Sequence, residues 1–350
     1  MRIGIFAHFG GKEYFTDGQT VKGKSLYAGL QKYASDVKID IVDTYYLRHN
    51  RFRFICDFIK MIVLDRKIIF LPAHDARRVL FHGFYLVKIF LRKKIYHDCI
   101  AGSLDKELTE HPNWVKYLNS FESNWMESPQ QVEKLKKMGV KNVVYIPNFK
   151  QIQPVSIDFI NNYKCSTPFR FVIFSRVEAM KGIDDALDAI RRVNEMKSAI
   201  VATLDIYGPV QPGSEGWFDE TLKNNTDICS YKGVCDPNES VDTLKEYFAL
   251  LFPTRYYTEG MPGTIIDAMF AALPVIARRW AWCDNMISSG ANGISYDFNE
   301  PEKLFDILVQ VVSNPDIVLS MKSQCLQEAK KYREDSVMSQ ILKLLDFDEL

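Results

Sequence analysis

The sequence has no apolar run of the roughly 18 uncharged residues that a membrane-spanning helix needs. Its most apolar stretch, 79–91, is interrupted by Lys88 and followed by Arg92. The start at Met1 also lacks the basic head, apolar stretch and small-residue cleavage site of a signal peptide. We therefore expect a cytoplasmic protein that does not cross a membrane.

Cysteines are few and irregularly spaced: there are seven in 350 residues, an odd number without a C-x-x-C pair. This usage is typical of reduced thiols and disfavours a disulfide framework or a zinc site.

The first strand pattern is not followed by G-x-G-x-x-G, the motif that lets a dinucleotide's pyrophosphate approach the backbone. A dinucleotide oxidoreductase is therefore disfavoured.

The formal net charge is zero, but it is unevenly distributed: residues 1–100 hold 18 Lys and Arg against 9 Asp and Glu. Two aromatic and basic stretches, 48–53 and 77–94, lie in this half. They could form a surface for peripheral contact with an anionic membrane and for a lipid-linked acceptor. The alternatives are that the aromatic residues pack in an ordinary core and that the basic residues are scattered, solvated charges. No nucleic-acid-binding motif accompanies the charge, so we expect no nucleic-acid partner.

Two similar series of strand and helix patterns follow each other along the chain. Short β-branched and aromatic runs alternate with longer helix-period stretches, and repeated βα units make a parallel sheet covered on both faces. The predicted strands are 2–9, 38–44, 67–73, 94–101 and 142–147, then 169–174, 200–207, 228–232, 250–253, 274–277 and 293–296, with final helices at 301–313 and 316–346. We predict an α/β fold of two Rossmann-like domains facing each other across a cleft.

The irregular stretch after Pro147 separates the two series. We predict an N-terminal Rossmann-like acceptor domain at 1–150, a linker at 151–168 and a C-terminal Rossmann-like donor domain at 169–330. The remaining residues, 331–350, are expected to form a C-terminal helix that packs back on the N-terminal domain.

Two cations follow the first strand of the second series. Arg176 and Lys181 lie in the loop between the strand 169–174 and the next helix. An Arg offers a planar fork of donors and a Lys a mobile point charge, so together they can neutralise a departing diphosphate. Solvated loop cations are the simpler interpretation of these two residues taken alone.

The stretch 251–276 places an acid and a helix start behind another strand. Glu259 stands in the loop, where small residues let the main chain approach an anion that the free amides of the first helical turn favour. Pro262 suits that first turn because its missing N–H has no intrahelical partner. Asp267 could accept hydrogen bonds from ribose hydroxyls, or it could simply favour the helix start through the helix dipole.

These motifs resemble the retaining glycosyltransferases of glycosyltransferase family 4, bacterial polysaccharide-assembly type, which have the GT-B fold. The resemblance spans the second series in order and rests on Ser175-Arg176 with Lys181-Gly182, Asp205-Ile-Tyr-Gly208, Tyr231-Lys-Gly233, Pro253, Glu259-Gly260-Met-Pro262 with Asp267-Ala268, and Pro274-Val275-Ile276. Asp267 stands where the family usually has Glu.

The resemblance also implies roles for single residues. Arg176 and Lys181 would bind the donor pyrophosphate and Glu259 the donor sugar, which makes these three the predicted catalytic residues. The predicted donor-binding residues are Gly10, Gly11, Gly260, Met261, Pro262, Gly263, Thr264 and Asp267. No metal and no cofactor is expected, because the two cations and the helix amides would offset the charge on the leaving diphosphate.

The first series matches the family more loosely. Gly10 and Gly11, and the segment Gly18-Gln19-Thr20-Val21-Lys22, resemble the first loop and helix start of the family, with a flexible surface turn as the alternative. Further candidates are Gln19, Gly102 and a catalytic histidine, either His74 at the end of the third predicted strand or His8 at the end of the first. His97 lies inside a strand. A lone His is more often structural.

The sequence therefore predicts transfer of a hexosyl group, with retention, from a UDP- or GDP-sugar to a saccharide. The acceptor is expected to be lipid-linked, in surface polysaccharide assembly, with the enzyme cytoplasmic and peripheral to the inner face of the cell membrane. The alternatives are a nucleotide-sugar epimerase of the same fold and a non-catalytic nucleotide-sugar-binding module.

Overall fold

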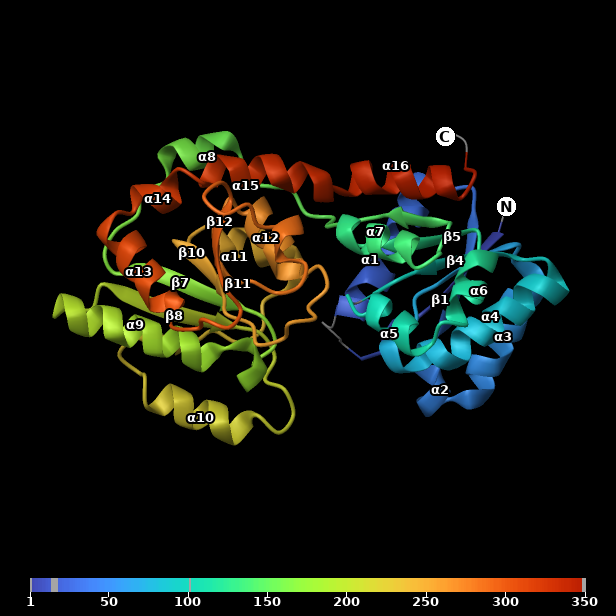
Figure 1. The fold of residues 1–350 in the computed structure, drawn as a ribbon, viewed down its shortest axis with the longest axis horizontal. Coiled ribbons are helices and arrows are strands. Elements are labelled where there is room, and N and C mark those ends of the chain that lie inside the picture. The colour runs from blue at the N-terminus through green and yellow to red at the C-terminus, as the bar shows by residue number, and fades with distance from the viewer. Residues whose placement is uncertain (1, 14–17, 101, 348–350) are drawn as a thin grey trace. The chain divides into compact units, whose positions relative to one another are not determined.

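The computed structural model describes residues 2–13, 18–100 and 102–347 (Figure 1). The chain divides into two compact units. The first unit joins Met1–Lys150 to Lys331–Leu350, and the second is the continuous segment Gln151–Lys330. The first unit is therefore built from both ends of the chain.

The first unit contains a six-stranded parallel sheet in the order β2-β1-β3-β4-β5-β6. Its strands are β1 (Arg2–Ala7), β2 (Lys38–Asp43), β3 (Lys67–Phe70), β4 (Lys94–Asp98), β5 (Ser123–Met126) and β6 (Val143–Tyr145). Most of their side chains are buried, as parallel strands covered by helices on both faces require.

Helices cover this sheet on both faces (Figure 1). They are α1 (Gly18–Tyr33), α2 (Tyr46–His49), α3 (Arg51–Leu64), α4 (Arg77–Leu91), α5 (Leu104–Glu110), α6 (Trp114–Ser120), α7 (Pro129–Lys137) and α16 (Glu334–Leu344), with the 3₁₀ turn η1 at His74–Ala76. Helices α3 and α4 contribute to one core cluster, whereas α1 and α16 contribute to another. In the latter, Met338 packs so close to Gly29 that a Cβ there would lie 2.6 Å from its Sδ.

The second unit repeats the arrangement with a parallel sheet in the order β12-β11-β10-β7-β8-β9. Its strands are β7 (Phe169–Phe174), β8 (Ala202–Tyr207), β9 (Cys229–Tyr231), β10 (Ala249–Phe252), β11 (Val275–Arg278) and β12 (Gly293–Tyr296). Its helices are α8 (Ile157–Asn162), α9 (Ile183–Lys197), α10 (Glu215–Lys223), α11 (Ser240–Leu244), α12 (Gly263–Phe270), α13 (Lys303–Ser313), α14 (Asp316–Leu319) and α15 (Lys322–Ala329), with 3₁₀ turns at η2 (Ala179–Lys181), η3 (Pro237–Glu239) and η4 (Cys283–Asn285). A further 3₁₀ turn, η5 (Lys330–Tyr332), spans the point in the chain where the second unit ends and the first resumes.

The predicted fold class, α/β with two Rossmann-like domains, is confirmed by these two sheets. Several predicted elements are wrong in detail. Strand β5 was not predicted, because Ser123 and Asn124 make its sequence look polar although both side chains are buried. The strands predicted at 67–73 and 94–101 end at Phe70 and Asp98, and Ala101 lies outside the described residues.

The single helix predicted at 316–346 is also wrong. The segment forms α14, α15, η5 and α16, and Arg333 adopts an extended backbone before α16 begins. Arg333 instead forms a parallel bridge with Lys150. Helical periodicity alone could not reveal the break, because apolar residues recur on both sides of it.

Within the described residues, no single helix is long and apolar enough to cross a membrane. One bent pair, Lys303–Ser313 with Asp316–Tyr332, meets the criteria of length and composition when its two parts are taken together across a 92° bend.

Candidate functional site

Three loops of the second unit meet tightly at the carboxyl ends of β7, β8 and β10. A Cβ on Gly182 would lie 2.0 Å from the carbonyl oxygen of Pro253, and one on Gly208 would lie 1.9 Å from that of Ser175. Both glycines have positive φ angles, 73° and 136°, which L side chains rarely adopt. Glycine at these positions lets the loops approach one another at the edge where parallel sheets usually bind ligands.

This approach brings together Lys181 and Glu259, which lie 78 positions apart in the chain. The Lys181 ammonium pairs with Oε1 of Glu259, and both side chains are largely buried, at 10% and 17% exposed. Thr254 donates its hydroxyl to the same oxygen at 3.1 Å. The ammonium also lies 5.0 Å from the centre of the Tyr256 ring. The pair is therefore held in place from several sides.

Arg176 lies beside this pair but is more open to solvent. Its side chain is 46% exposed, and its guanidinium lies 3.5 Å from Glu178. The hydroxyl of Tyr256 donates to the other oxygen of Glu178 at 3.0 Å. Within the part of the chain that the structure describes, Arg176 therefore has only this long ion pair and can direct its donor fork to an incoming anion.

The loop that carries Glu259 is anchored to the start of α9. Arg255 forms two hydrogen bonds with the carboxylate of Asp185, at 2.6 and 3.2 Å, and Arg278 lies 3.6 Å from the same group. The indole of Trp280 donates to the carbonyl of Gly260 at 3.2 Å. The sequence interpretation missed these anchors, because no local spacing relates residues that lie 20 to 93 positions apart.

Helix α12 begins at Gly263, and Pro262 is its N-cap rather than a residue of its first turn as predicted. The first turn thus starts with Gly263 and Thr264, and Met261 is buried just before it. Among the described residues, the buried hydroxyl oxygen of Thr264 has no hydrogen-bond partner. An anion at this helix terminus would meet free amides and a hydroxyl donor.

Asp267 lies within α12 and is only 3% exposed. Its Oδ1 accepts a hydrogen bond from the hydroxyl of Ser240 at 3.1 Å. This contact gives the carboxylate a structural role between α11 and α12, and its contact with ribose stays a prediction.

The glycines predicted at the first strand of unit one belong to a compact turn. Gly10 and Gly11 have φ angles of 83° and 61°. The amide of Gly11 donates to Asp43 at 2.8 Å, and a Cβ on Gly11 would lie 2.5 Å from the Tyr45 ring. That amide already has an acceptor within the unit, so its contact with a donor phosphate stays a prediction. Gln19 donates to the carbonyl of Leu71 at 3.0 Å.

The candidate histidines and Gly102 lie near the carboxyl end of the first sheet. His74 does not end a strand as predicted; it opens the turn η1, 58% exposed, with Nε2 3.5 Å from Glu107. His8 lies 2.7 Å from the Thr20 hydroxyl. Burial and the nearby Arg77 hold the pKa of His97 well below its usual value, so His97 is neutral in its strand. Gly102 is buried after β4.

A buried ionic cluster at the ends of β4 and β5 was not predicted from the sequence. The ammonium of Lys22 lies 2.6 Å from Asp98 and 3.0 Å from Glu127, and all three residues are less than a tenth exposed. Burial raises the pKa of Asp98 to about 6. Burial would lower the pKa of Lys22, but the two carboxylates raise it well above its usual value. The cluster fixes the start of α1 against the sheet.

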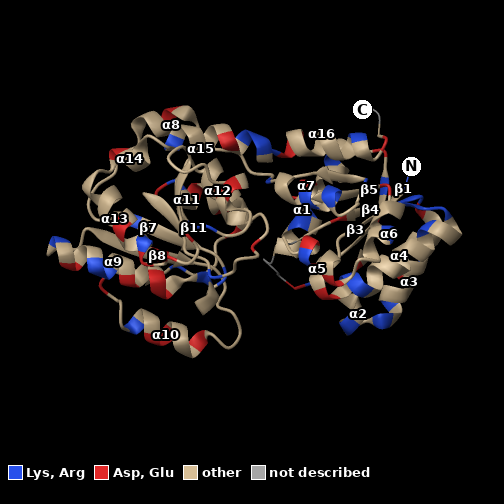
Figure 2. Cartoon of the chain, in the orientation of Figure 1, with Lys and Arg blue, Asp and Glu red and all other residues tan. Residues whose placement is uncertain are grey.

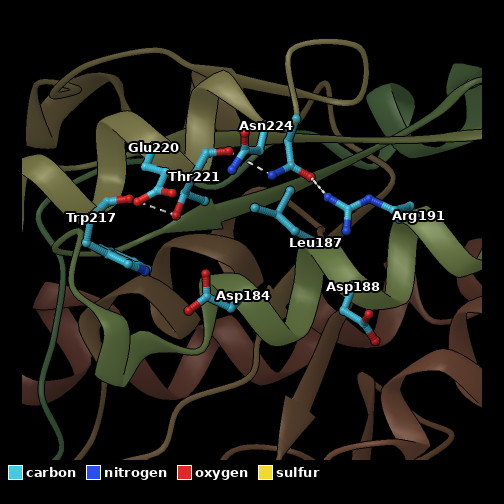
Figure 3. Close-up of a pocket in the computed structure, with 9 residues that line it drawn as sticks. Asp184, Leu187, Asp188, Arg191, Trp217, Glu220, Thr221 and Asn224 are labelled. Carbon is cyan, nitrogen blue, oxygen red and sulfur yellow. Dashed lines mark hydrogen bonds between the residues drawn. The ribbon is translucent and has the colours of Figure 1, made fainter.

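Two pockets of the second unit lie apart from the Lys181–Glu259 pair. The pocket in Figure 3, about 340 Å³, opens between α9 and α10 and is lined by Asp184, Leu187, Asp188, Arg191, Trp217, Glu220, Thr221, Asn224 and Asn225. A wider pocket of about 570 Å³ lies between the segment 151–159 and α11. Among the described residues, no group of three or more His, Cys, Asp or Glu side chains is placed to hold a metal ion.

Residues 168–314 match the family model described as "Glycosyl transferases group 1". Alpha-monoglucosyldiacylglycerol synthase of Acholeplasma laidlawii is 24% identical over 251 residues, which are 69% of this chain and 53% of that protein. An uncharacterized glycosyltransferase of Methanocaldococcus jannaschii, MJ1178, is 20% identical over 47% of this chain and 44% of its own length. The chain thus spans about half the length of the curated relatives it matches.

Similar solved structures share the whole two-domain fold. HepE of Anabaena, in complex with UDP, superposes with a TM-score of 0.76 at 14% identity over 99% of both chains. The sucrose-phosphate synthase of Thermosynechococcus elongatus gives a TM-score of 0.72 at 14% identity over 98% of both chains. The apo form of the lipopolysaccharide outer core galactosyltransferase WaaB gives 0.66 at 14% identity over the full length of both. These structures confirm the two-domain fold of GT-B glycosyltransferases.

Proposed function

We propose that this chain is a glycosyltransferase that takes its sugar from a nucleotide sugar bound at the carboxyl end of the second-unit sheet. The buried pair of Lys181 and Glu259 is the observation that carries this proposal. It lies beside Arg176 and within the segment that matches the glycosyltransferase family model. Lys181, Arg176 and the first turn of α12 offer a diphosphate the positive charge and N–H donors that it requires.

In this proposal the leaving nucleoside diphosphate is stabilised by protein groups. Lys181 and Arg176 bind the diphosphate oxygens, and the amides at Gly263 and Thr264 donate to the phosphate nearer the sugar. Glu259 accepts hydrogen bonds from the donor sugar's hydroxyls and orients its anomeric carbon. Bond cleavage places negative charge on the leaving oxygen, where the cations and amides already lie, so no metal ion is needed.

We propose that the donor is a UDP-sugar rather than a GDP-sugar. Support comes from the similar structures, since HepE of Anabaena was solved with UDP and with UDP-glucose, and the pneumococcal transferase GtfA with UDP and GlcNAc. The proposed transfer proceeds with retention of the anomeric configuration, as in the family that the motifs resemble.

The proposed acceptor is a lipid-linked saccharide in surface polysaccharide assembly, at the cytoplasmic face of the cell membrane. The names of two similar proteins support an acceptor that carries a lipid: one makes a glucosyl diacylglycerol, in which the sugar is joined to a lipid, and WaaB is a galactosyltransferase of the lipopolysaccharide outer core. The basic and aromatic segments of the first unit offer such an acceptor a suitable surface.

The test is a turnover assay with UDP-glucose, UDP-galactose and UDP-GlcNAc, each with and without lipid-linked saccharides. The proposal expects product only when donor and acceptor are both present, and proton NMR of that product should show the donor's anomeric configuration. Product formed from the donor alone would identify an epimerase instead. UDP-sugar binding without turnover on any acceptor would leave a binding module.

A further inference from the structure

The first unit exposes far more apolar surface than the second. Of the large hydrophobic side chains that are exposed in the described residues, eleven lie between positions 47 and 91 and six lie elsewhere. The most exposed are Phe52 at 79%, Phe90 at 76% and Val79 at 73%. Soluble surfaces rarely gather so many large apolar side chains over one pair of helices, so this region is expected to have a partner.

Most of the exposed apolar residues of α3 and α4 form one stripe on each helix, while Leu64, Ile89 and Leu91 lie outside the two stripes. On α3 the stripe residues are Phe52, Ile55, Ile59 and Val63, which at 100° per residue lie within about 80° of one another. On α4, Val79, Leu86 and Phe90 lie within about 40°. Each helix also has a separate inner stripe in the core, so neither outer stripe is needed for folding.

The two stripes belong to one face of the unit. Right-handed crossovers from β2 to β3 and from β3 to β4 run in the same direction across the sheet, so α3 and α4 cover the same side. Their inner residues Phe58 and Phe84 meet with ring centres 6.5 Å apart. We call the outer surface of α3 and α4, together with α2, the apolar-basic face.

This face carries an excess of positive charge. Residues 47–94 contain twelve Lys and Arg against three Asp, and because Lys67, Arg77 and Asp65 are buried, ten cations and two acids remain for the surface. Among the described residues, no acidic partner lies within ion-pair distance of the exposed side chains of Arg48, Arg51, Arg66, Arg78 and Arg92. Figure 2 shows the basic side of α2, which precedes the α3 stripe directly.

We propose that the apolar-basic face docks this protein on an anionic lipid bilayer, with α3 and α4 lying parallel to the membrane surface. The apolar stripes would enter the boundary between headgroups and acyl chains, and the arginines around them would meet lipid phosphates. A second copy of the chain fits poorly, because two such faces would oppose like charges. The inference is independent of the proposed donor site, which lies in the other unit.

The test is sedimentation of the full chain with phosphatidylcholine vesicles and with vesicles containing about one third phosphatidylglycerol. Binding is expected only to the anionic vesicles and should weaken with salt. The triple variant Arg48→Gln/Arg51→Gln/Arg78→Gln should bind about fivefold more weakly for each charge removed. The variant Phe52→Ser/Phe90→Ser should lose about tenfold for each side chain. Val234→Ser, which removes an apolar side chain that is 51% exposed in the other unit, is the control.

A native cysteine offers a second readout that does not depend on affinity. Cys56 is exposed on α3 beside Ile55, whereas Cys165 and Cys235 are partly buried and the other four cysteines are buried. In a Cys165→Ser/Cys235→Ser background, an environment-sensitive dye on Cys56 should shift to the blue when anionic vesicles are added. A Cys56→Ser control should take up no dye.

Three results would overturn the inference. The first is equal sedimentation with neutral and anionic vesicles, or with neither. The second is full vesicle binding by the Phe52→Ser/Phe90→Ser variant with an unchanged melting temperature. The third is a dimer in sedimentation velocity that shields the Cys56 dye without lipid, which would identify a second copy as the occupant.

Discussion

Lys181 donates a hydrogen bond to the carboxylate of Glu259, although the two residues come from loops that follow different strands of the second sheet. Both side chains are mostly removed from solvent, so the charges are strongly coupled. In the proposed enzyme the two residues have different roles: the ammonium of Lys181 binds the diphosphate, and the carboxylate of Glu259 binds the sugar.

Replacing Lys181 by alanine should weaken the binding of UDP by about 1.5–3 kcal/mol, the range for a hydrogen bond to a charged group. Titration calorimetry of wild type and Lys181→Ala, without metal, measures this difference. Lys223→Ala, on the exposed surface of α10, should bind as the wild type does. Equal UDP affinity in wild type and Lys181→Ala would remove Lys181 from the donor site.

Replacing Glu259 by glutamine should weaken the binding of the UDP-sugar but not the binding of UDP. The variant keeps its shape but loses the charged acceptor, so affinity for the UDP-sugar should fall by about 1.5–3 kcal/mol while affinity for UDP stays within about 0.5 kcal/mol. The same calorimeter measures both ligands. If UDP and the UDP-sugar weaken together, Glu259 acts through Lys181 rather than on the sugar.

Substituting Gly182 by alanine should destabilise the second unit beyond the penalty of its positive φ angle. That penalty is roughly 1–2 kcal/mol, and the overlap with Pro253 should add about 1–3 kcal/mol. Gly233 has a similar φ of 78°, and no atom of the described residues beyond its chain neighbours lies within 4 Å of its Cβ position, so Gly233→Ala isolates the first penalty. Urea unfolding of both variants measures the difference, and equal losses would mean that the loops relax freely.

Because of the buried Lys322, the free energy of unfolding should rise with pH in the alkaline range. Burial lowers its pKa to about 8, below the usual 10.5, and its ammonium donates to the carbonyl of Ala272 at 3.2 Å over the Tyr163 ring. The unfolded chain therefore binds more protons than the folded chain between pH 8 and 10.5, so the free energy of unfolding contributed by Lys322 rises with pH in this window. The rise is at most about 3 kcal/mol.

Urea unfolding of wild type and Lys322→Met at pH 7.5 and 9.5 tests this dependence. The free energy of unfolding of the wild type should rise relative to that of Lys322→Met between pH 7.5 and pH 9.5. A pH-independent difference would show that the lysine stays protonated when buried.

Turnover should persist in EDTA, because Arg176, Lys181 and the first turn of α12 are proposed to offset the charge of the leaving diphosphate. The assay compares initial rates with and without chelator after exhaustive dialysis. Complete loss of activity that manganese restores would require a metal ion and would contradict the proposed chemistry.

The rhythm of strands and helices was predictable because parallel strands buried on both faces are short, apolar and β-branched. β12 was predicted to the residue, as Gly293–Tyr296. β5 was not predicted because its polar residues Ser123 and Asn124 are buried. Their side chains form hydrogen bonds inside the unit, and composition does not reveal these partners. Likewise, nothing near Arg333 in the sequence marks its bridge to Lys150.

The candidate site was predictable as a set of residue types but not as a set of contacts. Arg176, Lys181 and Glu259 follow strands and so had to gather at one sheet edge, and their roles toward a donor stay predictions. The hydrogen bonds that hold these loops, from Tyr256 to Glu178 and from Arg255 to Asp185, join side chains that are far apart in the sequence. Sequence spacing gives no measure of such contacts.

The first unit is completed by the last segment of the chain, whose Val337, Met338 and Ile341 share a core with Leu26 and Leu30. A ribosome makes the whole of the second unit, residues 151–330, before it makes these residues. The first unit therefore cannot complete its core until α16 has been made, and a chain cut after Lys330 would leave Leu26 and Leu30 without these packing partners.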